Sequence, residues 1–224
     1  NPEIVSFFLA LGIKLLQGYG QTEASPVISA NRPNKIKIET VGPPVSGVEV
    51  RFADDGEILV RGDLLMKGYW RDDHSTATAI RDGWLYTGDI GSLDGDGYIT
   101  ITGRKKEIIV NSGGENIVPT RVEALLTIEP EIEQAMVDGD QRPWLAAVIV
   151  PSLEVRKTSN SEEALKLLIT ETVERANSRL SQIERVRRFI IADDNFTIEN
   201  SQLTATLKVR RHVVKAQYKD RLAA

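Results

Sequence analysis

The 224-residue sequence contains no cysteine and only two histidines, His74 and His212. Without cysteine, the chain has no disulfide, no cysteine-ligated zinc, no iron–sulfur cluster and no thiol nucleophile. Two histidines are too few for a histidine-rich metal site, and we expect both to lie on the surface. This composition fits a reducing compartment, so we expect a cytoplasmic protein.

Long apolar runs are also missing. The longest, such as residues 145–150, have the length of a β-strand, whereas a membrane-spanning helix needs about 18 apolar residues. The chain does not open on a secretory signal. Its 28 Lys and Arg against 32 Asp and Glu give a net charge of −4. That balance lacks the basic character of dedicated nucleic-acid-binding proteins, so we expect no nucleic-acid partner.

Two common catalytic signatures are missing as well, the Gly-x4-Gly-Lys-Ser/Thr phosphate loop and the Gly-x-Ser-x-Gly nucleophile turn. What the chain does have is the composition of soluble globular domains, with 41% hydrophobic and 27% charged residues. The length suffices for one or two domains with cores of their own.

The residue pattern divides the chain into three parts. In residues 1–40, helical spacing predicts a helix capped by Asn1 and ended by Gly12, then a strand at residues 13–16 and a polar turn at 18–23. A turn after an α/β strand is where open sheets bind ligands. The strand's partners and the initiator Met are missing, so we expect the chain to be a fragment whose large α/β domain begins upstream.

Residues 41–103 read as short strands joined by tight turns. One hairpin is predicted from strands at 48–52 and 57–61 around Asp55-Gly56, and a second hairpin signal at 93–97 precedes a strand at 98–102. This pattern predicts a small β-barrel subdomain. Residues 104–224 mix strands at 107–111, 134–138, 144–150 and 186–192 with helices at 119–127, after a capping box at 159–162, and after Lys208. We therefore expect an α+β chain that ends in an α+β lid domain.

Four polar clusters are candidates for function. In the first, Gly20 lets the backbone approach a ligand, and Tyr19 has the shape to cover a flat base. Thr22 beside Glu23 suits a phosphate oxygen and its Mg²⁺. The alternative is an ordinary turn with a capping threonine. In the second, Asp89 follows a Thr-Gly turn and suits a ribose diol, and the alternative is a helix cap or turn aspartate.

The third cluster joins residues 103–107 to a glycine pair, Gly113-Gly114, across a short strand. It reads either as a hinge beside an anion site or as a solvated linker with a hairpin turn. In the fourth, Lys208 follows a threonine-rich turn and could place a point charge on a phosphate. The alternative is the charged start of a helix. The cations of that helix read as a solvated face, or as contacts to coenzyme A phosphates or an anionic membrane surface.

Taken in order, these clusters resemble the C-terminal part of the adenylate-forming enzymes, the family of acyl-CoA synthetases, luciferases and peptide-synthetase adenylation domains. The matching segments are residues 18–23, 56–70, 83–91, 97–107 and 113–117. The sequences Gly-Arg-Lys-Lys-Glu and Ser-Gly-Gly-Glu-Asn are similar to long-chain fatty acyl-CoA synthetases of the bubblegum-like branch. Two departures stand out, Ala205 and Leu207, where many relatives have Pro and Gly.

The resemblance implies a role for each candidate. Tyr19 would pack on adenine beside Gly20, and Thr22 would contact the α-phosphate. Glu23 would hold Mg²⁺, and Asp89 would bind the ribose hydroxyls.

It also implies roles at the domain boundary and beyond. Arg104 would lie beside Asp89, and Lys106 would be the hinge. The loop at Gly113 and Gly114 would line the path of the coenzyme A thiol. Lys208 would contact the α-phosphate and the attacking carboxylate.

The function implied is that of an ATP-dependent long-chain fatty acid–CoA ligase, which makes acyl-AMP and then acyl-CoA. Its substrates are a fatty acid, ATP and coenzyme A, with Mg²⁺. The family's phosphate loop and most of its acyl pocket lie upstream, so we expect this fragment to be inactive alone and to need its own N-terminal domain. The alternatives are an acyl–carrier-protein ligase, another acyl-adenylating enzyme such as a luciferase, and a non-catalytic nucleotide-binding module.

Overall fold

The structure, a computed structural model, describes residues 2–223, with the side chains of residues 4–222. The chain divides into two compact units, Asn1–Lys106 and Glu107–Ala224, and both contain helices and sheets. The expected α+β class is therefore confirmed. The units divide after Lys106, three residues beyond the expected boundary at 103, and the finer division at residue 40 stays a prediction.

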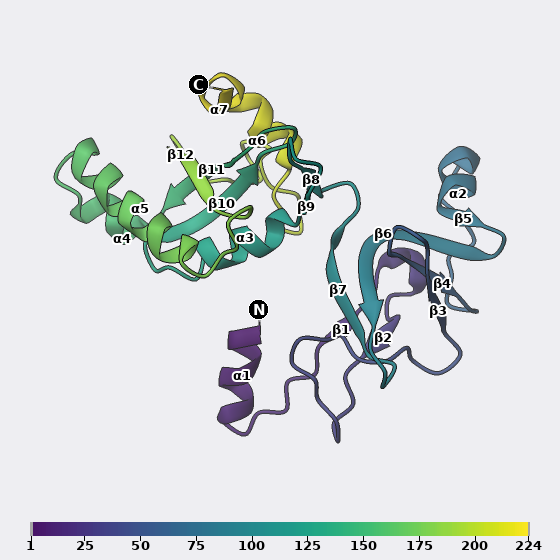
Figure 1. The fold of residues 1–224 in the computed structure, drawn as a ribbon. Coiled ribbons are helices and arrows are strands. Elements are labelled where there is room, and N and C mark those ends of the chain that lie inside the picture. The colour runs from purple at the N-terminus through teal and green to yellow at the C-terminus, as the bar shows by residue number, and fades with distance from the viewer. Residues whose placement is uncertain (1, 224) are drawn as a thin grey trace. The chain divides into compact units, whose positions relative to one another are not determined.

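The first unit is built around one curved sheet with the strand order β3-β4-β6-β5, in which β7 also pairs with β6 (Figure 1). A separate ribbon joins β1 to β2. The helices and strands of the first unit are α1 (Pro2–Ala10), η1 (Thr22–Ala24), α2 (Asp73–Ala79), β1 (Gly18–Tyr19), β2 (Ser29–Ala30), β3 (Glu49–Phe52), β4 (Glu57–Arg61), β5 (Ile80–Arg81), β6 (Trp84–Leu93) and β7 (Ile99–Arg104). Ile58, Val60, Leu85 and Ile99 of the sheet pack with Ile28 in its core.

Both predicted hairpins are confirmed. The β3–β4 turn closes with a 2.8 Å hydrogen bond from the Gly56 amide to the Ala53 carbonyl, and the β6–β7 turn with a 3.0 Å bond from Gly97 to Asp94. Both glycines have φ of +80°, a backbone conformation that side chains with a Cβ disfavour. The Asp-Gly signals in the sequence thus mark the true strand ends.

The prediction for the first segment is only partly correct. Gly12 ends α1 with a φ of +80°, as expected, whereas Asn1, the expected N-cap, lies outside the described residues. The expected strand at residues 13–16 is wrong, because those residues pair with no strand in the described part of the chain; β1 pairs with β2 instead. The structure also adds α2, which was not expected and which Asp72 caps by accepting from the Ser75 amide.

The second unit is built around the sheet β10-β11-β12, in which β11 is antiparallel to β10 and parallel to β12. A short β8–β9 hairpin stands apart from this sheet. The helices and strands of the second unit are β8 (Ile109–Val110), β9 (Asn116–Ile117), α3 (Pro119–Leu126), β10 (Ile132–Asp138), β11 (Leu145–Pro151), α4 (Leu153–Thr158), α5 (Glu162–Asn177), β12 (Val186–Ile191), α6 (Arg211–Gln217) and α7 (Lys219–Ala223).

The central strand β11 is buried on both faces. Leu145, Ala147 and Ile149 pack with residues of α3 and α5, whereas the alternate residues 146, 148 and 150 pack with α6 and α7 (Figure 1). A strand covered on both faces reads as a continuous apolar run, which is how the sequence revealed it. The N-cap of α5 is Ser161, whose hydroxyl accepts from the Ala164 amide, and not Ser159 as the capping box predicted. Among residues 2–223, no helix is both long and apolar enough to span a membrane.

Candidate functional site

The first polar cluster folds as a compact loop after β1. Tyr19 lies on β1, and its carbonyl accepts a 2.8 Å hydrogen bond from the Ile28 amide. A Cβ at Gly20 would lie 1.6 Å from the carbonyl oxygen of Pro26, so only glycine fits there. The sequence predicted a glycine here so that a ligand could approach the backbone, whereas the structure shows that the chain itself requires glycine, because Pro26 leaves no space for a Cβ. Thr22 then begins the 3-10 helix η1 and is exposed.

Three residues from separate motifs meet at Asp89. The Tyr19 hydroxyl donates a 2.6 Å hydrogen bond to Oδ2 of Asp89, and Nε of Arg104 donates a 3.0 Å bond to Oδ1. Asp89 is only 5% exposed, and yet both of its oxygens have a partner. Burial raises the pKa of the Tyr19 hydroxyl, and the hydrogen bond to the Asp89 carboxylate raises it further. The cluster is thus an ordered, charge-assisted junction.

Strand pairing explains how the junction forms. Asp89 on β6 lies opposite Arg104 on β7 in the antiparallel register, so their side chains reach each other across the pair. Asp89 therefore lies within a strand and not at a helix cap or in a loose turn. The strand is irregular there: Gly88 has a φ of +72°, and the Asp89 amide donates to the Thr87 hydroxyl at 3.1 Å.

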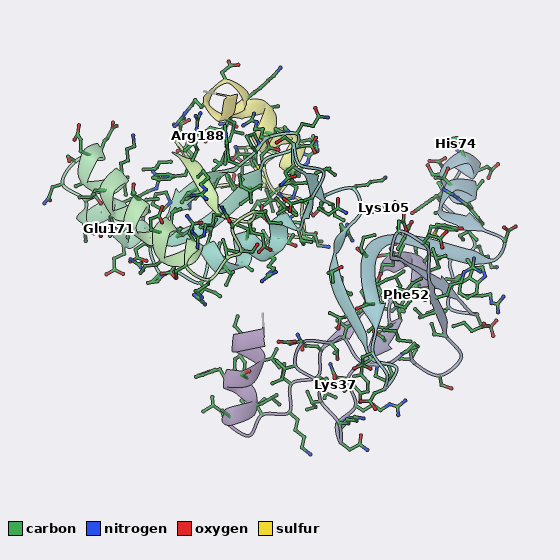
Figure 2. The ribbon with its side chains drawn as sticks, in the orientation of Figure 1. Lys37, Phe52, His74, Lys105, Glu171 and Arg188 are labelled. Carbon is green, nitrogen blue, oxygen red and sulfur yellow. The ribbon has the colours of Figure 1, made fainter. Side chains whose placement is uncertain are left out.

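A buried glutamate supports this irregular stretch. Glu57 on β4 accepts a 2.9 Å hydrogen bond from the Gly88 amide and another, also 2.9 Å, from the ammonium of Lys105. The Lys105 amide returns to the Gly88 carbonyl at 2.8 Å, and its side chain, labelled in Figure 2, also pairs with Asp55. Sequence reasoning missed these roles of Glu57 and Lys105. The signal was there, because a charged residue stands directly before an apolar strand run.

Lys106, the expected hinge residue, follows Lys105 at the boundary between the two units. Its side chain is exposed, and it makes no hydrogen bond or ion pair with any other side chain that the structure describes. The preceding residue, Lys105, is held in the first unit by Glu57 and Asp55. The position of Lys106 in the chain is therefore compatible with a hinge, and that role stays a prediction.

Glu23 lies on η1 and is half-buried. Its Oε1 accepts a 2.9 Å hydrogen bond from the Tyr69 hydroxyl, and its carbonyl accepts the Met66 amide at 2.8 Å. Burial and the Glu23 carboxylate both raise the pKa of Tyr69. The described residues hold no group of three or more His, Asp or Glu side chains arranged for a metal. A single carboxylate still fits Mg²⁺, which takes one or two carboxylates together with phosphate oxygens.

In the second unit the glycine pair forms the tip between β8 and β9. Oδ1 of Asn111 accepts the amides of Gly113 and Glu115, each at 2.9 Å, and Gly114 has a φ of +79°. The loop borders a cavity of about 300 Å³. The lining of this cavity also includes Trp144 and two arginines, Arg185 and Arg187.

Lys208 closes a tight turn. The Thr204 amide donates to the Lys208 carbonyl at 2.8 Å, and the Lys208 amide donates to the Thr204 hydroxyl at 3.0 Å. Within the described residues, the exposed ammonium of Lys208 has no hydrogen bond or ion pair. Because α6 begins only at Arg211, Lys208 lies in a turn and is not the start of a helix.

The cations that follow Lys208 are mostly bound within the unit. Arg211 pairs with Glu123, and Lys215 pairs with Asp138 at 2.8 Å. Arg221 pairs with Asp193 at 2.9 Å. These pairs neutralise the helix charges locally and favour the solvated face over a coenzyme A or membrane contact.

Both histidines lie on the surface, as expected. His74 lies on α2 and is labelled in Figure 2, and His212 lies on α6. Among the described residues, neither histidine belongs to a group of three or more side chains that could hold a metal ion.

The structure thus brings Tyr19, Asp89 and Arg104 into direct contact, with Thr22 and Glu23 on the loop that follows Tyr19. The glycine pair and Lys208 belong to the other unit. That all of them surround one nucleotide stays a prediction.

Comparison with known proteins adds independent findings. Residues 1–70 match the AMP-binding enzyme family, and residues 106–224 match the AMP-binding enzyme C-terminal domain. The long-chain-fatty-acid–CoA ligase FadD15 of Mycobacterium bovis is 41% identical over 97% of this chain and 39% of its own length. A chloroplastic long-chain-fatty-acid–[acyl-carrier-protein] ligase of Arabidopsis thaliana, AEE15, is 35% identical over 96% of this chain and 33% of its own length.

Among solved structures, the adenylation domain of a carboxylic acid reductase from Segniliparus rugosus, in complex with AMP and a co-purified carboxylic acid, has a TM-score of 0.85. It is 29% identical and covers all of this chain and 37% of its own chain. The chain therefore spans between 33 and 39% of the length of these two curated relatives.

Proposed function

Because the chain belongs to the AMP-binding enzyme family, we propose that it is the C-terminal part of an ATP-dependent long-chain fatty acid–CoA ligase. In the first step a fatty carboxylate attacks the α-phosphorus of ATP, which forms acyl-AMP and releases pyrophosphate. In the second step the thiolate sulfur of coenzyme A attacks the acyl carbon, which forms the thioester and releases AMP. The 41% identity to FadD15 supports this substrate class.

The observation that carries the proposal is the junction of Tyr19, Asp89 and Arg104. Each carboxylate oxygen of Asp89 has accepted one hydrogen bond and retains capacity for another, as a ribose diol requires. Its two donors, the Tyr19 hydroxyl and Nε of Arg104, fix the orientation of the carboxylate. The Tyr19 ring, held through its hydroxyl, is thereby available to lie along the base of the same nucleotide.

The neighbouring loop supplies groups for the phosphates. The exposed Thr22 hydroxyl suits the α-phosphate, and the Glu23 carboxylate suits a magnesium ion. Bound Mg²⁺ would neutralise phosphate oxygens. Tyr69 orients the Glu23 carboxylate through its hydroxyl. Lys208, exposed and unpaired within the described residues, suits the charge that gathers on the α-phosphate as the adenylate forms.

Coenzyme A is assigned to the second unit. Gly113 lines the cavity, and neither glycine of the Gly113-Gly114 tip carries a side chain, which suits a thin pantetheine chain that passes close to backbone. Arg185 and Arg187, which line the same cavity, have the charge that phosphates require. Because the two steps need different surfaces over one adenylate, a hinge at Lys106 suits the reaction.

The complete protein that contains this chain tests the proposal. A panel of fatty acids of increasing length is incubated with ATP and Mg²⁺, and AMP release is measured with coenzyme A and, separately, with acyl carrier protein. We expect release that depends on fatty acid and coenzyme A. ATP binding without pyrophosphate or AMP release from any acid would contradict a ligase and favour a non-catalytic nucleotide-binding protein.

The carrier-protein arm addresses a second candidate function. The 35% identity to the acyl-carrier-protein ligase of Arabidopsis favours that acceptor as the alternative to coenzyme A. Faster AMP release with carrier protein than with coenzyme A would reassign the second step and leave the adenylation step unchanged. The cavity arginines, Arg185 and Arg187, would then lose their proposed ligand.

A further inference from the structure

The turn that carries Lys208 is joined firmly to the rest of its unit at its base. Leu203 and Val209 form an isolated antiparallel bridge, and the Arg210 amide donates a 2.7 Å hydrogen bond to the Gln202 carbonyl. Leu203 is buried with side chains of α6 and α7. The chain then passes from the turn directly into α6. The base of the turn is therefore fixed, while the Lys208 side chain makes no hydrogen bond or ion pair within the described residues.

Arg211, the first residue of α6, binds three other segments of the same unit. Its guanidinium pairs with the Glu123 carboxylate on α3 and donates a 3.2 Å hydrogen bond to the Val137 carbonyl on β10. Its Nε lies 3.6 Å from a carboxylate oxygen of Glu107, the first residue of the second unit. Only a planar, multidentate side chain can serve these three acceptors together.

The acceptor on α3 is itself fixed. Glu123 uses its other oxygen to accept a 2.7 Å hydrogen bond from the Val137 amide. Burial raises the pKa of the Glu123 carboxyl, and the charge of Arg211 opposes that rise. The arginine thus helps to keep a buried carboxylate ionised, and removing it would leave that carboxylate without its charged partner.

We propose that Arg211 is a positioning residue for adenylation, which holds the Lys208 turn to α3, β10 and Glu107. The inference rests on the proposed function, because it takes Lys208 as the group that meets the α-phosphate. Lys208 has no side-chain partner in the described part of the chain, so its direction depends on its backbone. Arg211, three residues later, ties that backbone to the residue after the proposed hinge, so that Lys208 turns with the unit as one body.

The test uses the complete protein and separates the two half-reactions. In Arg211→Gln we expect the kcat of pyrophosphate exchange to fall about tenfold, because a displaced catalytic group is costly, while the KM for ATP stays the same. Thioester formation from supplied acyl-adenylate should change less than twofold. Arg211→Lys, which keeps the charge and is the milder change to the fold, should recover part of the exchange rate.

A double variant separates positioning from general damage. If Arg211 acts through Lys208, Arg211→Gln should cause no further loss of exchange in a Lys208→Ala background. The matched control is Arg221→Gln. It removes another arginine–carboxylate pair, between Arg221 on α7 and Asp193, and should leave pyrophosphate exchange unchanged. In a separate hydrogen–deuterium measurement, the backbone amide proton of Lys208 should be replaced by deuterium faster in Arg211→Gln than in wild type, and at the wild-type rate in the control.

Three outcomes would overturn the inference. Full exchange activity in Arg211→Gln would show that the anchor is unnecessary, and an equal loss in the Lys208→Ala background would show that it acts elsewhere. An equal loss in both half-reactions, in Arg211→Lys as well as Arg211→Gln, would indicate general damage to the unit. Absence of exchange in the wild-type protein with every fatty acid would instead overturn the proposed function itself, on which this inference rests.

Discussion

Asp89 in the first unit and Lys208 in the second are held in opposite ways. Asp89 is 5% exposed, and both of its carboxylate oxygens accept hydrogen bonds from neighbouring side chains. Lys208 is exposed, and within residues 4–222 its ammonium has no hydrogen bond or ion pair. In the proposed reaction, Asp89 would hold the nucleotide through both steps and can therefore be fixed in advance. Lys208 would be needed in only one step and must be able to approach and leave the nucleotide.

The contrast has an energetic consequence. Substituting Asp89 removes interactions that also stabilise the fold, so binding and stability should fall together. Substituting Lys208 removes no interaction that the structure describes, so activity should fall alone. Variants at Asp89 and Lys208 therefore test whether stability and activity fall together at the first position and separately at the second.

The largest effect is expected for Lys208→Ala in the complete protein. Loss of one positioned charge in a transition state costs about 100- to 1000-fold in rate. Pyrophosphate exchange should fall by that factor, while thioester formation from supplied acyl-adenylate and the unfolding temperature stay close to wild type. Lys219→Ala, which removes an exposed lysine from α7, is the control. Equal losses in both half-reactions would remove the adenylation role from Lys208.

Asp89→Asn should change stability as well as binding. Hydrogen bonds to a charged group contribute about 1.5–3 kcal/mol, and Arg104 and Tyr19 would lose their charged partner. We expect the free energy of unfolding of the first unit to fall by about 2 kcal/mol, with a higher KM for ATP. The control is Asp63→Asn at an exposed carboxylate. Unchanged stability together with a raised KM would mean that the junction serves the nucleotide alone.

Tyr19 gives the junction a pH dependence. Burial and the Asp89 carboxylate raise the pKa of its hydroxyl above the ordinary value of 10.0. The stability from this proton is present below pH 10 and is lost as the pH rises through the folded-state pKa. A spectrophotometric titration of wild type against Tyr19→Phe should therefore show no ionisation of Tyr19 near pH 10 until the protein unfolds. Ionisation of Tyr19 at pH 10 in the folded protein would contradict the hydrogen bond between Tyr19 and Asp89.

The sequence predicted elements whose signals are local. The Asp55-Gly56 turn needs only its own two residues, and the burial of β11 on both faces follows from one apolar run. Residues 13–16 carried a similar apolar signal and did not form a strand, because a strand also needs a partner. Sequence periodicity reports which face is apolar and says nothing of which neighbour is present.

The candidate site divides in the same way. Residue types and order were enough to single out Tyr19, Asp89 and Arg104, but not to show that the Tyr19 hydroxyl ends on Asp89, 70 residues away. Glu57 was missed because a charged residue directly before an apolar strand does not reveal its partner, which here is the backbone amide of Gly88. Long-range contacts of this kind come from strand register, and register is set by the whole sheet.

The smallest predicted effect concerns the stiffness of the turn that carries Lys208. Leu207 has a φ of +60° and is 69% exposed, so it occupies a left-handed conformation without burial in return. That conformation costs a residue with a Cβ about 1–2 kcal/mol. Leu207→Gly should raise the free energy of unfolding of the second unit by up to about 1 kcal/mol, the flexibility of glycine in the unfolded chain offsetting the rest. Leu207→Ala keeps the Cβ and should give no gain, so an equal gain in both variants would point to the exposed leucine side chain and not to the backbone.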